Sequence, residues 1–178
     1  MSEAQTPPSR IRPDRRFLLS HPAHFISLGF GSGLSPIMPG TAGTLFGWLV
    51  FYVLTAAWPG VFTQMAWSII VALGFVLGIW TCTKSGNALN SPDDGSMVWD
   101  EIIGIWLVLL IFMPTTLLGQ CWLFLLFRLF DMSKPPPIRQ VDAQLKGGLG
   151  VMADDILAAI YAIIAYVLIA YFLPGITS

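Results

Sequence analysis

Long apolar stretches alternate with three short blocks that hold every charged residue of the chain. The blocks lie at residues 3–16, 84–101 and 128–155. A helix that crosses a bilayer needs about 20 predominantly apolar residues, at a rise of about 1.5 Å each. The charge-free stretches therefore predict membrane-spanning helices over residues 41–58, 61–82 and 156–173.

The charge-free stretch 102–127 is long enough for one span, or for two shorter arms broken at Met113-Pro114. Cytoplasmic loops of membrane proteins are enriched in Lys and Arg. Four arginines before residue 17 predict a cytoplasmic N-terminus, and two crossings return the chain to that side at Lys84. A hairpin over 102–127 keeps the later basic residues on the same side. We therefore favour five crossings with an outer C-terminus, and four crossings stay open.

Composition supports this pattern and excludes several protein classes. Hydrophobic residues make up 55% of the 178 residues and charged residues 11%, with a mean hydropathy of +0.72. Soluble domains have about 25% charged residues, so an ordinary soluble globule is excluded, as is a disordered chain. The net charge of −1 gives no basic face for nucleic acid. Cys82 and Cys121 lie in apolar runs and are expected to be inert thiols rather than a disulfide or zinc framework.

The sequence thus predicts an all-α fold, a polytopic membrane bundle of four to five transmembrane helices. Residues 1–20 are expected to form a polar, mobile cytoplasmic tail. Residues 21–178 are expected to form one membrane-embedded catalytic domain. The sequence leaves the oligomeric state open.

A segment rich in Gly and Pro, GFGSGLSPIMPGTAGT, occupies residues 29–44. Gly and Pro are unfavourable in helix interiors, so we expect a re-entrant or interfacial loop here. Glycine lets backbone N–H groups approach an anion closely, and the positive end of the first span would face that anion. Two interpretations stay open: a packing loop, or a phosphate-binding site formed by Ser32, Gly33 and Thr41.

Acidic pairs border two of the predicted spans, Asp100-Glu101 before 102–127 and Asp154-Asp155 before 156–173. The helix dipole favours acids at such ends. A charge deep in a bilayer nevertheless costs about 2.5–3.5 kcal/mol, so these acids indicate a functional site. Adjacent helical residues point about 100° apart. We therefore expect one residue of each pair to bind a ligand directly and the other to support it.

Carboxylates that converge from different helices repel one another unless a cation neutralises them. Mg²⁺ prefers oxygen ligands and is commonly bound by carboxylates together with a substrate phosphate. Arg128, Lys134 and Arg139 are available to bind phosphate oxygens. Arg128 and Asp131 share a helix face at i,i+3 spacing. These features favour phosphate chemistry on a lipid headgroup, while an ion pathway or a structural role stays open.

Four segments in this order resemble the bacterial phosphatidylglycerophosphatase A family: GFGSGLSPIMPGTAGT, SMVWDEIIGIW, FRLFDMSKPPPIR and GGLGVMADDI. The resemblance runs from about His21 to the last predicted span. The chain departs from the family pattern at Ala153 and in its longer polar N-terminus. The matching positions are Gly31, Ser32, Gly33, Pro36, Pro39, Gly40, Thr41, Asp100, Glu101, Gly104, Arg128, Asp131, Lys134, Pro135, Pro137, Arg139, Asp142, Gly147, Gly148, Gly150, Asp154 and Asp155.

The resemblance implies a Mg²⁺-dependent, multi-pass enzyme of the bacterial inner membrane with its N-terminus and active site on the cytoplasmic side. Its implied reaction is the hydrolysis of phosphatidylglycerophosphate to phosphatidylglycerol and inorganic phosphate, a step of phospholipid biosynthesis. The implied partners are this lipid and the membrane, with no nucleic acid.

We assign the residue roles within that activity as a hypothesis. Mg²⁺ is bound by Asp100 and Asp154, with Glu101 and Asp155 as further ligands or orienting groups. Asp131 serves as the base that activates water, and a phospho-aspartyl intermediate is the alternative. The phosphate oxygens are held by Arg128, Lys134, Arg139, Ser32, Gly33 and Thr41.

Two rival functions remain at this stage. A Mg²⁺-dependent membrane phosphatase or phosphotransferase for another lipid would use the same acids. A cation-coupled carrier is disfavoured, because the outer halves of the predicted spans lack ionisable groups along a path through the bilayer.

Overall fold

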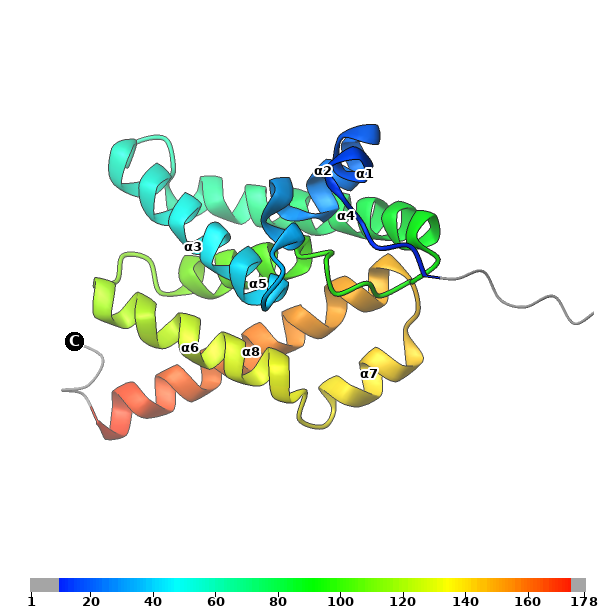
Figure 1. Cartoon of the computed structure of the whole chain (residues 1–178). Helices are drawn as coiled ribbons and strands as arrows, with labels where there is room; N and C mark the ends of the chain where they lie inside the picture. Colours follow the sequence, from blue (N-terminus) through cyan, green and yellow to red (C-terminus); the bar gives the residue numbers. More distant parts are fainter. Residues whose placement is uncertain (1–9, 174–178) are drawn as a thin grey trace, which may run out of the picture.

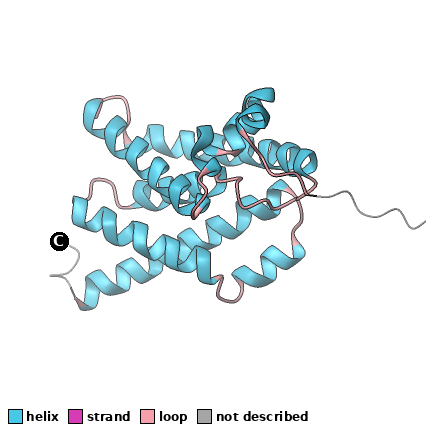
Figure 2. Ribbon diagram, in the orientation of Figure 1, coloured by secondary structure: helices cyan, strands magenta, loops and turns pink. Residues whose placement is uncertain are grey.

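The computed structural model describes residues 10–173, without the side chains of 141–143, and these residues form helices and loops with no strand (Figures 1 and 2). This confirms the predicted all-α class. The elements in chain order are α1 (Arg15–Ser20), α2 (Pro22–Ser27), the 3₁₀ segment η1 (Gly29–Leu34), α3 (Pro39–Ala57), α4 (Gln64–Leu89), α5 (Trp99–Ile111), α6 (Leu117–Ser133), α7 (Ile138–Gln144) and α8 (Gly148–Phe172).

Three of the described helices are long and apolar enough to span a membrane, namely α3, α4 and α8. They cover the predicted spans to within three residues at the ends where they fall short, and α4 and α8 also extend into the polar blocks. Helix α8 begins eight residues before the predicted start at 156, so Asp154 and Asp155 lie inside the helix rather than before it. The glycine at its start explains the difference, because a Cβ on Gly148 would overlap the Ile79 carbonyl of α4.

The charge-free stretch 102–127 forms two helices, with the break where Met113-Pro114 predicts it. Helix α5 has 13 residues and α6 has 17. Their lengths of about 20 and 26 Å are shorter than the bilayer core of about 30 Å. The expected count of four to five spans therefore remains a prediction beyond the three long helices. The outer C-terminus also remains a prediction, and residues 174–178 lie outside the described residues.

Helix α5 lies at the centre of the bundle and packs against α3, α4, α6 and α8. Ten of its residues are buried, as expected for a helix that is apolar on all sides. Glycines on neighbouring helices allow this close approach: a Cβ on Gly74 of α4 would collide with Ile103. Trp99 and Trp106 of α5 donate indole hydrogen bonds to the carbonyls of Gly74 and Gly47, at 2.9 and 2.7 Å.

The segment rich in Gly and Pro divides into two parts. Its first part is irregular: Phe30, Gly31 and Met38 all have positive φ angles, which agrees with the predicted loop. Its second part is helical, because Pro39 occupies the first turn of α3, the helix position where proline is best tolerated. Residues 41–44, which the sequence places both in this segment and in the first predicted span, therefore belong to the helix, and α3 begins two residues before that span.

Residues assigned to the mobile tail are in part folded. Asp14 caps α1 by accepting a hydrogen bond from the Phe17 N–H at 2.8 Å. Arg10 forms an ion pair with Asp94 at 2.7 Å. Residues 10–20 therefore belong to the folded unit, and residues 1–9 of the predicted tail lie outside the described residues.

Candidate active site

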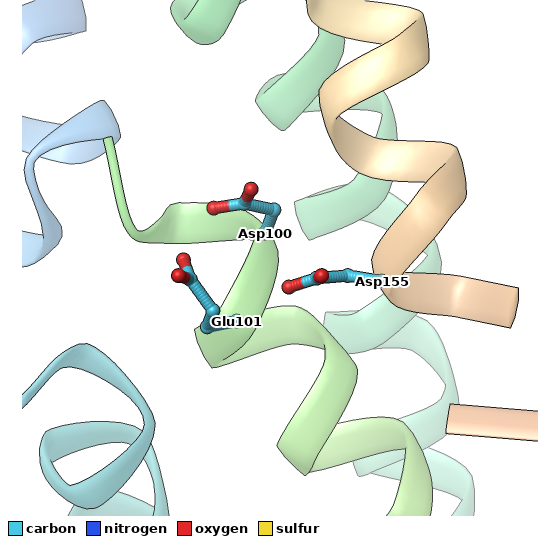
Figure 3. A group of neighbouring side chains, drawn as sticks. All are labelled: Asp100, Glu101 and Asp155. Carbon is cyan, nitrogen blue, oxygen red and sulfur yellow. The ribbon is translucent and has the colours of Figure 1, made fainter. Parts of the chain in front are cut away.

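Three carboxylates from two helices converge at one end of the bundle (Figure 3). Asp100 and Glu101 lie in the first turn of α5, and Asp155 lies near the start of α8. One oxygen of each lies within 4.8 Å of the other two. We refer to Asp100, Glu101 and Asp155 as the carboxylate trio.

Each member of the trio has a buried oxygen without a hydrogen-bond partner: Asp100 Oδ1, Glu101 Oε2 and Asp155 Oδ2. Asp100 is 8% exposed and Asp155 is 2% exposed. Buried polar atoms are nearly always satisfied in folded proteins, and like charges this close repel. An all-oxygen donor set with three unused oxygens suits a hard divalent cation such as Mg²⁺. The trio could therefore hold such a cation.

The expectation that Asp100 and Glu101 do not serve one centre equally, with one binding a ligand directly and the other supporting it, stays a prediction. One carboxylate oxygen of each nevertheless lies within 4.8 Å of an Asp155 oxygen, and the three carboxylates are neighbours in Figure 3. The longer Glu side chain makes up the angular offset between neighbouring positions. Of the second acidic pair, only Asp155 joins the trio.

Asp154 has a different partner. It accepts a hydrogen bond from Lys134 Nζ at 2.6 Å, at the point where α6 ends. The hypothesis that Asp154 is a principal ligand and Asp155 a supporting one stays a prediction, although the geometry brings Asp155 into the trio. One helical step of about 100° separates the two side chains, and the packing of α8 against α5 and α6 decides which of them faces the trio.

Arg128 of α6 lies beside the trio, with a side chain that is 11% exposed. Its Nη1 lies 3.9 Å from Glu101 Oε1, and it also forms an ion pair with Asp131. The i,i+3 pairing predicted for Arg128 and Asp131 is thereby confirmed. Asp131 in turn interacts electrostatically with Glu101 and Asp155. The Nε of Arg128 is buried without a partner, so its guanidinium retains a donor for an anion.

The start of α3 completes this side of the site. Thr44 accepts a hydrogen bond from Arg128 Nη1 at 3.4 Å, and Thr41 Oγ1 is buried without a partner. Helix α3 has no side-chain cap, so the N–H groups of its first turn point out of the helix end. A helix N-terminus next to an arginine favours an anion such as phosphate.

The other residues predicted to bind phosphate are placed elsewhere. Ser32 donates to the Gly29 carbonyl at 2.8 Å and stabilises the η1 turn. Gly33 is buried against the Ser96 carbonyl, where a Cβ would not fit. Lys134 pairs with Asp154, and Arg139 is exposed on α7. For Ser32 and Gly33, the packing-loop interpretation therefore fits the structure.

Three small residues near the site were not assigned a role from the sequence. A Cβ on Gly40 would overlap Glu101 Oε1 and lie 3.1 Å from Arg128 Nη2. A Cβ on Gly104 would overlap the Phe127 ring and lie 3.6 Å from Asp155 Cβ. Thr44, the third, is fully buried and bonded to Arg128. For Gly40 and Thr44, the sequence signal was the spacing of Gly and Thr in the first turns of α3. That spacing does not specify which residues of other helices they contact.

Comparisons with known proteins agree on one family. The family model for phosphatidylglycerophosphatase A matches residues 25–170. Phosphatidylglycerophosphatase A of Escherichia coli is 40% identical over 149 residues, which cover 82% of this chain and 81% of that protein. Phosphatidylglycerophosphatase A of Haemophilus influenzae is 40% identical over 164 residues, covering 90% of this chain and 96% of that protein.

A protein of Bacteroides thetaiotaomicron, provisionally named a phosphatidylinositol-3-phosphatase, is also similar. It is 38% identical over 144 residues, which cover 78% of this chain and 87% of that protein. No solved structure matches the chain.

Proposed function

The chain belongs to the phosphatidylglycerophosphatase A family, and from this premise we propose that it hydrolyses phosphatidylglycerophosphate to phosphatidylglycerol and inorganic phosphate. The observation that carries the proposal is the carboxylate trio with its unpartnered oxygens, which lies beside Arg128 and, through the bond from Arg128 to Thr44, beside the start of α3. Groups for a cation and groups for a phosphate thus lie side by side. Phosphate-ester hydrolysis on a lipid headgroup uses both.

Asp100, Glu101 and Asp155 would hold Mg²⁺, and their unused oxygens fit this role. Bound Mg²⁺ would neutralise the carboxylates, polarise the phosphate and make water a stronger nucleophile. The side chains and backbone of the protein carry out the other parts of the reaction. Arg128 and the N–H groups at the start of α3 orient the terminal phosphate. They also stabilise the negative charge that grows on its oxygens.

We assign the role of base to Asp131, which pairs with Arg128 beside the trio. In this role it would accept the proton of a water that attacks the phosphorus opposite the glycerol oxygen. The P–O bond to water forms, the P–O bond to the glycerol oxygen breaks, and the water proton passes to Asp131. The departing glycerol oxygen takes a proton from solvent. A phospho-aspartyl route through one of the acids is the alternative.

We place the site on the cytoplasmic face of the bacterial inner membrane. Arg10 is tied to Asp94 in the loop that leads into α5, so the arginines of residues 10–16 lie on the side of the protein where α5 begins. Basic residues mark the cytoplasmic side of membrane proteins. A single cysteine at exposed Ser133, at the site end of α6, should react with an impermeant reagent only after the membrane is opened. Reaction in intact cells would contradict the proposed orientation.

The reaction is tested by measuring phosphate release from phosphatidylglycerophosphate by purified protein in detergent, with Mg²⁺ and with EDTA. Phosphatidic acid and phosphatidylinositol 3-phosphate serve as competing substrates, the latter because of the Bacteroides relative. We expect release that requires Mg²⁺ and is fastest with phosphatidylglycerophosphate. Folded protein that prefers another lipid would support the second candidate, a phosphatase for that lipid.

A further inference from the structure

An apolar groove runs between α3 and α6 on the surface of the bundle. It has a volume of about 350 Å³ and is lined by Leu45, Trp48, Leu49, Tyr52 and Leu117. Leu45, Leu49 and Leu117 are all at least half exposed. A hollow of about 140 Å³ shares Tyr52 with this groove and continues toward Met113 and Pro114. The surface between these two helices is therefore hollowed over several helical turns.

The groove starts where the candidate active site ends. Helices α3 and α6 run antiparallel, and Arg128 of α6 meets Thr44 of α3 at the site. One turn further along, Trp48 packs against Phe124 with ring centroids 5.7 Å apart and donates to Gln120 at 2.8 Å. Beyond this contact, Tyr52 and Leu117 line the groove. The same two helix faces thus carry a polar site and then an apolar channel.

The length of this path fits one leaflet of a membrane. From Arg128 back to Leu117, α6 extends about 16 Å at a rise of about 1.5 Å per residue. Half of a bilayer hydrocarbon core is about 15 Å. A fatty acyl chain whose headgroup lies at Arg128 would therefore run beside α6 to about the middle of the bilayer.

We propose that the groove between α3 and α6 binds an acyl chain of the lipid substrate while Arg128 and the start of α3 hold its terminal phosphate. This inference rests on the proposed function. We identify the bound group as an acyl chain because the candidate phosphate site at Arg128 adjoins the apolar groove, which extends over about the depth of one leaflet. A phospholipid monoester has this pattern of an anionic head and an apolar chain. The substrate enters sideways from the membrane, and the Trp48–Gln120 hydrogen bond fixes the spacing of the groove walls.

The test fills the groove without touching the site. Leu49→Trp puts a large ring into the channel, and Leu73→Trp on α4 is the matched control at a surface position that is 66% exposed. Each variant is given long-chain phosphatidylglycerophosphate in mixed micelles and, separately, the same glycerophosphate headgroup without acyl chains. We expect Leu49→Trp to raise KM for the long-chain lipid about tenfold, because buried methylene contacts are lost. Turnover of the chain-free headgroup and all activities of Leu73→Trp should stay unchanged.

Each other outcome contradicts the groove assignment or its premise. Equal loss on both substrates means that Leu49→Trp damages the site, and no loss on either means that no chain binds there. A changed oligomeric state of Leu49→Trp in detergent would make the groove a contact between copies. If the unaltered protein releases no phosphate from the long-chain lipid, the proposed function itself fails.

A second measurement avoids substitutions altogether. The unaltered protein is irradiated with a non-hydrolysable phosphonate analogue of the substrate that carries a photoreactive group on one acyl chain. Labelling should fall on the peptides that contain Leu45–Tyr52 and Leu117. Excess phosphatidylglycerophosphate should suppress it, and excess phosphatidylcholine should not. Labelling that phosphatidylcholine suppresses equally would mean general lipid contact and would overturn the proposal.

Discussion

Asp94 and Asp100 are both buried, yet their surroundings differ completely. Asp94 is 1% exposed and accepts hydrogen bonds from Arg10 Nε at 2.7 Å and from Ser96 Oγ and N at 2.6 and 3.1 Å. Asp100 is 8% exposed, has an oxygen without a partner and lies against two further carboxylates. The two residues stand in one short segment, on either side of the start of α5.

The contrast separates a structural acid from a functional one. A buried charge that is fully hydrogen-bonded anchors its surroundings, and its removal leaves its partners unsatisfied. A buried charge without partners destabilises the folded protein, so its presence indicates a role in binding. The Asp94 cluster ties the N-terminal arm to the loop before α5. The carboxylate trio has three unpartnered oxygens, which we propose bind a cation.

The largest expected effect is a loss of phosphatase activity, and substitutions of the neighbouring residues Asp155 and Asp154 should differ in its size. Asp155→Asn should lower phosphate release by more than about a hundredfold, because a residue that touches the cation should matter more than an orienting partner. Asp154→Asn, which removes the ion pair with Lys134, should cost less. The measurement is kcat/KM on phosphatidylglycerophosphate, with membrane yield as the folding control. A greater loss for Asp154→Asn would contradict the assignment.

Arg128 provides the next largest effect. Arg128→Lys keeps the positive charge but loses the planar set of donors that reaches Thr44, Asp131 and the phosphate. Loss of a charged hydrogen bond corresponds to about 10- to 100-fold in kcat/KM. Arg139→Lys, at an exposed position on α7, is the control and should be unchanged. Equal activity of the two variants would remove Arg128 from phosphate binding.

Mg²⁺ should raise the unfolding temperature of the protein only by binding to the carboxylate trio. Ligand binding to the folded state raises the unfolding temperature, so Mg²⁺ should stabilise the protein in detergent by a few degrees relative to EDTA. Asp155→Asn should abolish this shift, and Asp94→Asn should keep it despite a lower starting value. A shift that survives in Asp155→Asn would place the cation elsewhere.

The smallest effect concerns acid stability. Burial raises the pKa of Asp94, but the hydrogen bonds from Arg10 and Ser96 outweigh it and hold that pKa below its usual value. The folded state then binds this proton less readily than the unfolded state. The stabilisation is therefore present above the unfolded pKa of about 3.9 and is lost as the pH falls through the folded value.

Asp94→Asn should therefore flatten the loss of unfolding temperature at acidic pH. Arg10→Ala should flatten it less, because the Arg10 side chain is 61% exposed and its ion pair is screened by solvent. Both variants should retain their Mg²⁺ response. An unchanged acid profile in Asp94→Asn would mean that other acids dominate that region.

The sequence predicts the helices well where charge and proline mark their limits. The charge-free runs locate α3, α4 and α8, and Met113-Pro114 locates the break between α5 and α6. It predicts the start of α8 poorly, because the acids at 154–155 look like a helix end. Contact of Gly148 with α4 decides where that helix begins. Such contacts join residues far apart in the chain and leave no local signal.

The site shows the same limit. Asp100, Glu101 and the Arg128–Asp131 pair follow from spacing and from the cost of burying charge. The choice of Asp155 over Asp154 depends on the rotation of α8 relative to α5, which no local pattern specifies. The role of Ser32 and Gly33 could not be decided from the sequence, because glycine permits both an anion-binding turn and close packing; the Ser96 carbonyl occupies the space beside Gly33.

The candidate active site is assembled from four segments in chain order: the start of α3, the start of α5, the end of α6 and the start of α8. Asp155, the last contributor, is carried on the final described helix. During synthesis, the trio therefore cannot form until the start of α8 has left the ribosome. A chain halted after α6 has Asp100, Glu101 and Arg128 but not the third carboxylate of the trio. Under the proposed mechanism, such an incomplete chain lacks one cation ligand and does not process lipid.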